Sequence, residues 1–505
     1  MSGQGKRFKE AGYPDPKPLI LVDGSPIIKH VIDLFPGETN IHCICNEEHL
    51  ATTDMRATLL NVSPGVKIHS IPSHSLGPVH AVLSIADTIR DDDEVIVSYC
   101  DYGTVWNYAG LLSEMRGLQA DGGIAAYRGF HPHMLGKDNY AFMRHEDEWM
   151  IEIREKEPFT TDRMSEYASN GTYYFRNGAI LKQFCRELVA TGVAGQKNGE
   201  YYMSLVYNCM VAAGQKVRIF EIERMLQWGT PHDLEVYKMW SAHFARKPEA
   251  AYESSATLVL PMAGRGSRFM VEGFSNPKPL LDVAGKPMIL RAVESIPHTQ
   301  SQVFICLKEH LESYPVREQL EETFPGCKIV VIDDVTEGQA CTCEIGILQA
   351  GLAPDEPIMI SACDNGVDYN KAAYKALEED PTVDVIVWSF TNNPTGKHFP
   401  QMYAWMDVDE TNGDIRHVSV KKPLQGARHA IIGTMFFRRT DLYMKGLDAI
   451  YKSNTRTNGE FYVDNLLNPL IEMGHKVKVF EADAYICWGT PADYRTYNYW
   501  LNHFR

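Results

Sequence analysis

The chain has 505 residues, of which 44% are hydrophobic and 23% are charged, and its formal net charge is -16. A single hydrophobic core seldom extends beyond about 300 residues, so at least two domains are expected. The acidic balance argues against a broad surface for nucleic acid or anionic lipid, because both require an excess of Lys and Arg. No apolar run approaches the length of about 20 residues that spans a bilayer, and no secretory signal follows Met1, so a cytoplasmic protein is predicted.

The cysteines argue against a disulfide framework and a zinc ribbon, because their number is odd, at 11, and no C-x-x-C pair occurs. Two pairs have i, i+2 spacing, Cys43 with Cys45 and Cys341 with Cys343. Such neighbours share one face of a strand, and buried free cysteine is common. Reduced cysteines that pack in the core are therefore predicted.

An internal repeat organises the chain. The segment from Met1 aligns without a gap with the segment from Met262. The correspondence then continues through Asp101 and Asp364, Gly171 and Gly433, Glu200 and Glu460, and the Trp-Gly-Thr-Pro runs at Trp228 and Trp488. A polar segment with a proline separates the copies, so the predicted domains are residues 1–245 and 253–505.

Each copy alternates short β-branched runs with helical periodicity, which is typical of a doubly wound, Rossmann-like α/β domain with a mostly parallel sheet. Strands are predicted at residues 41–45, 94–99, 257–261, 302–307, 328–332 and 357–362, and helices are predicted from Pro26 and Pro287. The second copy's glycine loop follows strand 257–261, whereas the first copy begins at the loop. A start upstream of Met1 is favoured over a first domain that lacks a strand and is less stable.

A glycine turn opens each copy, formed by Gly3 and Gly5 or by Gly264 and Gly266 and followed by Arg7 or Arg268. Glycines let backbone N–H groups approach a phosphate, and the next helix N-terminus favours an anion. An arginine there could bind phosphate oxygens through two hydrogen bonds. Phe8 and Phe269 occupy the place of the third glycine of a dinucleotide fingerprint, which disfavours NAD, and no Walker sequence closes the loop. An ordinary glycine turn is the alternative.

A lysine and an aspartate follow each loop. Lys17 and Lys278 each stand between two prolines, which fix the backbone and hold the cation in place. Asp101 and Asp364 end an apolar strand. Ligands collect beyond the carboxyl ends of parallel strands, so these carboxylates could hold Mg²⁺ against a triphosphate. A solvated loop lysine and a turn aspartate are the structural alternatives.

The loop, lysine and aspartate together resemble the sugar nucleotidyltransferase, or nucleotide-sugar pyrophosphorylase, family, and most of all its cytidylyltransferase-like and capsule-associated members. The resemblance covers nearly the whole chain. It implies that a sugar-phosphate oxygen attacks the α-phosphorus of a nucleoside triphosphate, with CTP mildly preferred, and that pyrophosphate leaves. Arg7 and Arg268 would then hold the pyrophosphate, Lys17 and Lys278 the α-phosphate, and Asp101 and Asp364 the Mg²⁺.

The resemblance also implies residues for the two substrates. The nucleobase would lie against the turns that contain Gly77 in the first copy and Gly338 and Gln339 in the second. The sugar phosphate would meet Lys156, Glu200 and Gly171 in the first copy and Lys421, Glu460 and Gly433 in the second. Glu155 precedes Lys156, but Val420 precedes Lys421, and which of Lys421 and Lys422 acts is open.

The sequence departs from the family at the second metal aspartate, where Gln227 and Cys487 stand. Neither is a good Mg²⁺ ligand, so Mg²⁺ would rely on one aspartate with phosphate and water, or on Glu223 and Asp483 as substitutes. His131 and His133 are interpreted as surface residues of a polar loop and receive no role. The aromatic runs at 173–175 and 435–437 are interpreted as core strands.

Three functional hypotheses remain. Both copies transfer nucleotides, or one copy has become a nucleotide-sugar sensor or scaffold, or, least favoured, the chain is a nicotinamide-dependent oxidoreductase. Phosphocholine is an alternative acceptor, and a homo-oligomer is compatible with the sequence.

Overall fold

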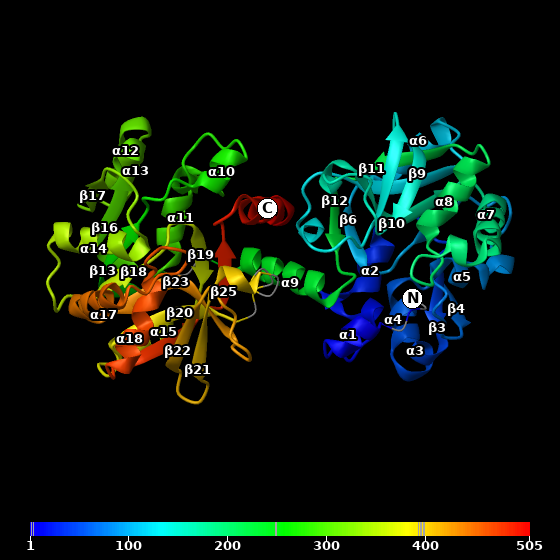
Figure 1. Ribbon diagram of the computed structural model, residues 1–505. Coiled ribbons are helices and arrows are strands. Elements are labelled where there is room, and N and C mark those ends of the chain that lie inside the picture. The colour runs from blue at the N-terminus through cyan, green and yellow to red at the C-terminus, as the bar shows by residue number, and fades with distance from the viewer. Residues whose placement is uncertain (2, 4, 248–249, 392, 394–395, 397–398) are drawn as a thin grey trace. The chain divides into compact units, whose positions relative to one another are not determined.

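The computed structural model describes residues 1, 3, 5–247, 250–391, 393, 396 and 399–505. The chain divides into two compact units, Met1–Ser241 and Ala242–Arg505, here named the first and the second unit. Each unit combines a β-sheet with helices (Figure 1), so the predicted α/β class is confirmed. None of the described helices is both long and apolar enough to cross a membrane.

The described part of the second unit is built on a nine-stranded sheet of order β17-β16-β13-β18-β23-β20-β24-β22-β21. The strands are β13 (Glu253–Pro261), β16 (His298–Leu307), β17 (Lys328–Ile332), β18 (Ile358–Ile360), β20 (Val385–Phe390), β21 (Ala404–Asp409), β22 (Asp414–Val420), β23 (His429–Phe437) and β24 (Val477–Glu481). The four strands at the β17 end are parallel, and β23 runs antiparallel to both β18 and β20. The sheet is therefore mixed rather than mostly parallel as predicted, because β23, β22 and β21 run antiparallel to their neighbours, and the glycine loop follows a strand of its parallel half.

Helices cover both faces of this sheet, which confirms the doubly wound arrangement. Buried residues of α14 (Gln339–Ala350), α17 (Thr440–Ser453) and α18 (Leu467–Glu472) form one core with the sheet. Buried residues of α11 (Met288–Ser295), α13 (Val316–Thr323) and α15 (Lys371–Glu379) form the other. The remaining elements are α10 (Ser267–Val271), α12 (Lys308–Ser313), α19 (Pro491–Phe504) and the short pairs β14 (Asp282–Val283) with β15 (Lys286–Pro287) and β19 (Asn365–Asp368) with β25 (Ala484–Cys487).

Helix α11 illustrates how local sequence produces these elements. Pro287 is its N-cap, and Ile289, Ala292 and Val293 are buried with the i, i+3, i+4 spacing of one helical face. The helix ends before Ile296. The corresponding α2 (Ile27–Asp33) also has a proline, Pro26, as its N-cap, so both helices begin one residue later than predicted.

The first unit repeats these elements but divides its sheet. The described strands β5 (Val95–Ser98), β10 (Tyr167–Phe175), β7 (Gly122–Tyr127), β11 (Val217–Glu221), β9 (Trp149–Glu155) and β8 (Ala141–Glu146) form one sheet in that order. Strands β3 (His42–Asn46) and β4 (Lys67–Ile71) form a separate parallel pair. Its helices are α1 (Lys6–Glu10), α2, α3 (Glu47–Thr52), α4 (Met55–Val62), α5 (Pro78–Leu83), α6 (Tyr108–Gly117), α7 (Gly178–Ala190), α8 (Met203–Ala212) and α9 (Pro231–Ala245), and the short strands are β1 (Leu21–Val22), β2 (Ser25–Pro26), β6 (Tyr102–Val105) and β12 (Arg224–Gln227).

The division of the first sheet lies where the second unit has β13. Strand β13 pairs in parallel with β16 on one side and with β18 on the other. Among the described residues of the first unit, no strand joins the corresponding β3 and β5. All four residues of β5 are partly exposed, whereas all three residues of β18 are buried. Within the described part of this unit, β3 pairs only with β4 and β5 pairs only with β10, so each has one unpaired edge.

Candidate active site

Each glycine turn leads into a short helix that one phenylalanine anchors. Gly5 and Gly266 both have φ of 62°, a left-handed conformation that costs glycine nothing, and they form the N-caps of α1 and α10. Phe8 and Phe269, one turn later, are 2% and 1% exposed. The residue that replaces a third glycine is thus a core anchor, and the neighbouring arginine, Arg268 in the second unit, is exposed.

The predicted lysine and aspartate meet in both units. Lys17 Nζ lies 2.8 Å from Asp101 Oδ2 and donates to the carbonyl oxygen of Gly229 at 3.1 Å. Lys278 Nζ lies 2.6 Å from Asp364 Oδ2. Both lysines begin a 3-10 turn whose proline is buried, Lys17–Leu19 and Lys278–Leu280, so the backbone is fixed as the flanking prolines predict.

The glycine loop lies beside the same pair. A Cβ on Gly266 would lie 3.3 Å from the Cβ of Lys278. In the first unit, Lys17 Nζ lies 5.2 Å from the centroid of the Phe8 ring, which follows the loop. Loop, lysine and aspartate therefore converge in each unit, although their predicted ligands stay predictions.

Charge at the second site is balanced. Burial raises the pKa of Asp364, but the Lys278 ammonium outweighs burial and, together with Arg268, holds the pKa of that carboxyl below its ordinary value. Burial lowers the pKa of Lys278, and Asp364 outweighs it, so the ammonium stays charged. The pair keeps opposite charges at neutral pH.

A further aspartate that sequence reasoning missed lies at each site. Burial raises the pKa of Asp233 to about 6, the Asp101 charge adds to this rise, and Thr230 and Arg7 oppose it. Thr230 Oγ1 donates to Asp233 Oδ2 at 2.6 Å and accepts from the Asp233 N–H at 3.1 Å, which is a reciprocal cap of α9.

The second unit repeats this arrangement. Thr490 Oγ1 donates to Asp493 Oδ2 at 2.6 Å, and the charge of Asp364 adds to the burial that raises the pKa of Asp493. A signal was present in the sequence, since an aspartate follows Trp-Gly-Thr-Pro at the same distance in both copies.

The proposed substitutes Glu223 and Asp483 are wrong on geometry. Each immediately precedes β12 or β25, whereas Gln227 and Cys487 end these strands beside the site. A strand advances about 3.3 Å per residue, so four residues place each substitute more than about 10 Å away along the strand. Glu223 contacts Arg224 instead, and Asp483 forms an ion pair with Arg246 at 2.9 Å.

The donor atoms fit Mg²⁺ in both units, with one difference. In the first unit a Cβ on Gly229 would lie 3.0 Å from Gln227 Oε1 and 3.1 Å from Asp101 Oδ2, so amide and carboxylate oxygens face one space. In the second unit Cys487 replaces the amide, and burial together with Asp493 and Asp364 raises the pKa of its thiol well above the ordinary value. A protonated thiol is a poor ligand for Mg²⁺, which prefers oxygen.

Metal binding would therefore rest on two carboxylates in each unit, Asp101 with Asp233 and Asp364 with Asp493, completed by substrate phosphates. The described residues contain no group of three or more His, Cys, Asp or Glu side chains placed to hold a metal.

The turns expected near the nucleobase pack tightly on the segment that carries the sugar-site glutamate. A Cβ on Gly77 would lie 2.8 Å from the carbonyl oxygen of Tyr201, and one on Gly338 would lie 2.5 Å from backbone atoms of Phe461. Both glycines have positive φ, 88° and 143°. The glycines are thus required for close packing. Gln339 begins α14 beside this contact, and nucleobase binding by these turns stays a prediction.

The expected sugar-phosphate residues of the first unit form a connected set. Lys156 Nζ donates to Tyr202 OH at 2.6 Å, and Tyr202 OH donates to Glu200. Gly171 has φ of 97° at an irregularity of β10 and packs against Tyr99. In the second unit Gly433 has φ of 102° at the matching irregularity of β23. Lys421 Nζ lies 5.6 Å from the centroid of the Tyr462 ring, and Glu460 is exposed.

Three smaller interpretations have clear outcomes. His131 is 4% exposed, and burial lowers its pKa to about 4, so the histidine pair belongs to the core and its interpretation as surface was wrong. Cys43 and Cys45 are buried in a strand as expected, whereas Cys341 and Cys343 lie on helix α14. The aromatic runs at 173–175 and 435–437 are buried in β10 and β23, as predicted.

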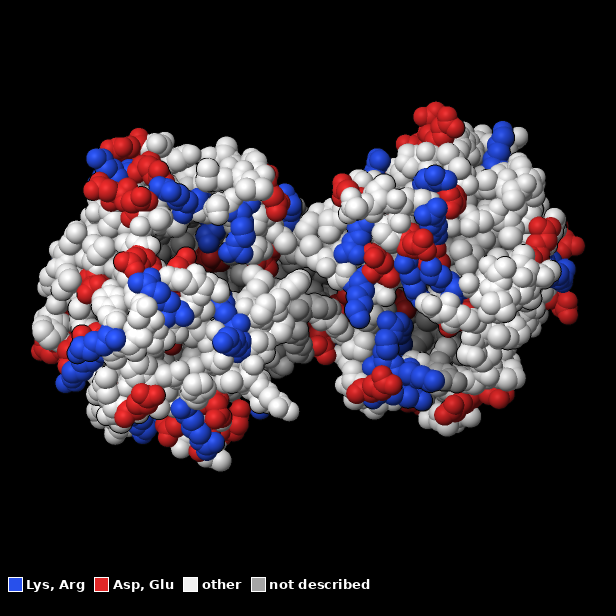
Figure 2. All heavy atoms as spheres, viewed as in Figure 1, with Lys and Arg blue, Asp and Glu red and all other residues white. Residues whose placement is uncertain are grey.

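Figure 2 shows that basic and acidic side chains are interspersed over the visible face of each unit, and that a hollow in each has Lys or Arg atoms at its rim. Basic side chains are thus present at each hollow although the net charge of the chain is -16.

Comparisons with known proteins agree with this repeat. The model of the nucleotidyl transferase family matches residues 1–214, and that of the MobA-like NTP transferase domain matches residues 258–404. The bifunctional protein GlmU of Rhodopseudomonas palustris (strain BisB5) is 22% identical over 263 residues, which are 52% of this chain and 55% of that protein. The chain thus spans about half the length of this curated relative.

Solved structures resemble one half of the chain. A nucleoside-diphosphate-sugar pyrophosphorylase from Vibrio cholerae RC9 has 20% identity and a TM-score of 0.41, over 48% of this chain and 98% of its own. The inositol-1-phosphate CTP transferase from T. maritima has 15% identity and a TM-score of 0.39, over 50% and 97%. The chain thus carries two NTP transferase domains in tandem, one matched over residues 1–214 and the other over residues 258–404.

Proposed function

We propose that each unit transfers a nucleotidyl group from a nucleoside triphosphate to a phosphorylated small molecule, a sugar 1-phosphate being the expected class. An acceptor phosphate oxygen forms a bond to the α-phosphorus, the bond between the α-phosphorus and the bridging oxygen breaks, and pyrophosphate leaves. The observation that carries this proposal is the lysine–aspartate pair at the glycine loop, present at 2.8 Å in one unit and 2.6 Å in the other.

The reaction needs positioned charge rather than a protein nucleophile. Arg7 and Arg268 hold the leaving pyrophosphate. Asp101 and Asp364 would hold the metal, and the ammonium groups of Lys17 and Lys278 beside them would bind the α-phosphate. When bound, Mg²⁺ supplies positive charge to the phosphate oxygens.

The acceptor half of each site uses a second lysine. Lys156 and Lys421 bind the acceptor phosphate, and Glu200 and Glu460 accept hydrogen bonds from its hydroxyl groups. CTP is the triphosphate we propose to test first, and phosphocholine is included among the acceptors.

The test uses the full chain with Mg²⁺, a panel of triphosphates and acceptor phosphates, and measurement of pyrophosphate. The variants Lys17→Met and Lys278→Met each silence one unit, so each should lose a different part of the product set, and the double variant should make no product. Full activity in the double variant would rule out the proposed site.

A second candidate is that the first unit binds a nucleotide sugar without transferring it. The two sites have diverged, since Tyr102 follows Asp101 whereas Asn365 follows Asp364, and this divergence is the observation behind the candidate. In that case Lys17→Met leaves all product formation unchanged, while a nucleotide sugar still raises the melting temperature of the Lys278→Met variant.

A further inference from the structure

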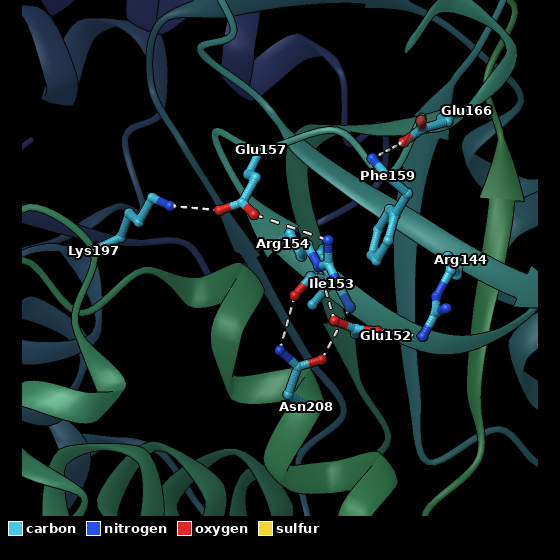
Figure 3. A network of polar contacts seen from close by, with 9 residues as sticks. All are labelled: Arg144, Glu152, Ile153, Arg154, Glu157, Phe159, Glu166, Lys197 and Asn208. Carbon is cyan, nitrogen blue, oxygen red and sulfur yellow. Dashed lines mark hydrogen bonds and ion pairs between the residues drawn. The ribbon is translucent and has the colours of Figure 1, made fainter. Parts of the chain in front are cut away.

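The strand that carries the acceptor-site lysine is held in the same register in both units. In the first unit the side chain of Asn208, on α8, accepts from the N–H of Ile153 at 3.0 Å and donates to its carbonyl oxygen at 2.8 Å (Figure 3). In the second unit Asn468, on α18, makes both bonds to Val418, each at 2.8 Å.

This pair of hydrogen bonds from an asparagine to one strand residue, here named the asparagine clamp, shows which residues of the two units correspond. Two residues beyond the clamped position stand Glu155 in the first unit and Val420 in the second, and the next residues are Lys156 and Lys421. Both lysines have left-handed backbones, with φ of 57° and 59°. Lys421, rather than Lys422, is therefore the counterpart of Lys156.

The same clamp aligns the facing elements, so that Ser204 corresponds to Asp464, each four residues before the clamping asparagine. In the first unit Glu155 is 7% exposed and accepts from Ser204 Oγ at 2.6 Å. In the second unit the strand residue is the apolar Val420, and the acid stands opposite as Asp464. The carboxylate thus stands on the lysine-bearing strand in the first unit and on the facing segment in the second, and each unit keeps one.

A reciprocal exchange of this kind indicates that the charge itself is needed. If the carboxylate served only to fill space, an apolar residue at the position of Glu155 would need only an apolar residue at the position of Ser204. The second unit has an aspartate there instead. The two positions that exchange the acid are more than 40 residues apart in sequence, so preferences of the local backbone do not link them. Each pocket also contains a half-buried lysine, whose ammonium is costly to bury without a counter-charge.

Charged groups around Lys421 point to its partner. Burial lowers the pKa of Lys421, and the charge that opposes burial most is that of Asp464; Asp364 and Glu460 act in the same direction, and Arg268 acts against them. In turn, burial raises the pKa of Asp464 to about 6, and Lys421 opposes the rise. Lys421 also donates to the carbonyl oxygen of Met402.

The two lysines are otherwise held differently. Lys156 is bonded to Tyr202, which in turn is bonded to Glu200. Around Glu155, an ion-paired set braces the end of the strand: Arg154 lies 2.9 Å from Glu152, and Lys197 lies 3.0 Å from Glu157 (Figure 3). The acceptor-site lysine of the second unit instead depends on the facing wall.

We propose that Asp464 is the positioning carboxylate of the second unit, which keeps Lys421 charged and directed at the acceptor phosphate, and that it stands in for the carboxylate that Glu155 supplies beside Lys156 in the first unit. The inference about the acceptor rests on the proposed function, whereas the coupling of Asp464 to Lys421 does not. Asp464 thus takes over the role of the glutamate that the second copy lacks.

The test measures the reaction of Lys421 with acetic anhydride in the full chain, as a function of pH and by mass spectrometry. Asp464→Asn should raise the labelling rate of Lys421 near neutral pH by about threefold to tenfold, because the uncharged amine rises about tenfold for each unit by which its pKa falls. Asp448→Asn, which removes the exposed partner of Lys452, is the matched control and should leave Lys421 unchanged.

Rescue separates positioning from folding. The double variant Val420→Glu/Asp464→Ser rebuilds the first unit's arrangement and should return both the labelling profile and the KM for the acceptor to within about twofold of the original chain, while Asp464→Asn raises that KM about tenfold with less effect on kcat. If Asp464→Asn does not fold, the double variant decides alone.

Unchanged labelling in Asp464→Asn, or accelerated labelling in the double variant, overturns the proposal. Absence of any product from the original chain would reject the proposed function, and the labelling result would still decide the link between Asp464 and Lys421.

Discussion

Replacing Lys278 by methionine tests the central pair, because methionine keeps most of the apolar stem and removes the charge. Lys278 Nζ lies 2.6 Å from Asp364 Oδ2, and the two side chains are 19% and 26% exposed. Breaking a fully buried pair costs about 3–5 kcal/mol, and an exposed pair contributes about 0–1 kcal/mol. For a pair one-fifth to one-quarter exposed we expect a loss of about 2 kcal/mol in the free energy of unfolding of the second unit.

The assay is thermal unfolding of the full chain, followed with pyrophosphate release. A loss of about 2 kcal/mol lowers the melting temperature of a domain of this size by about 4–8 °C. Removing one charged donor from developing phosphate charge lowers the kcat of the second unit's reaction by about 100-fold or more, while products of the first unit still form. The control is Lys286→Met, since Lys286 pairs with Glu294 at side-chain exposures of 47% and 39%, and should change the unfolding free energy by less than about 0.5 kcal/mol.

The effect also has a pH dependence of fixed sign. Lys278 holds the pKa of Asp364 below its ordinary value, so the pair contributes stability above the unfolded pKa of about 3.9 and loses it as pH falls through the lower folded pKa. The difference between variant and original chain should therefore shrink in acid. If Lys278→Met has the same melting temperature as Lys286→Met at neutral pH, or if its second unit keeps its turnover, the reasoning is refuted.

Three further predictions rest on particular contacts. Burial raises the pKa of Asp233 to about 6, so this carboxyl makes the first unit more stable as pH falls from about 6 towards 4. Asp233→Asn should therefore flatten that part of the profile of melting temperature against pH. The same variant should weaken the Mg²⁺ dependence of turnover. Because β5 has an open edge and β18 does not, backbone amides of β5 should exchange hydrogen for deuterium at least about tenfold faster than those of β18 in the full chain, and equal rates would contradict the divided sheet. Gly77→Ala should lower the unfolding free energy of the first unit by about 2 kcal/mol or more, because the new Cβ would lie 2.8 Å from Tyr201 and the backbone has a positive φ. Gly117→Ala, at an open site, is the control and should change this free energy little. Denaturant unfolding measures both.

Much of the site could be predicted from sequence because its parts are local and occur twice. A glycine loop, a lysine between prolines and an aspartate after an apolar strand each carry their own backbone constraints. The order of parallel strands then brings them to one edge. Lys278 and Asp364 meet as this argument requires.

Other features depend on partners distant in sequence. From sequence alone Asp233 would be interpreted as a helix cap, because its interaction with Asp101 and Arg7 depends on the tertiary structure. From sequence Glu223 is interpreted as a substitute metal ligand. The direction of β12 places it at the end of the strand away from Asp101. His131 reads as a loop residue, and packing places it in the core.

The sequence by itself determined the duplication, the α/β class and the order of loop, lysine and aspartate, because these follow from periodicity and short motifs. Only the tertiary structure decided that an aspartate of the last helix of each copy joins its site, and that Asp464 is electrostatically coupled to Lys421. The physical reason is that a side chain's charge state and partners are set by which strands and helices pack against it, and long-range packing leaves no mark in the spacing of nearby residues.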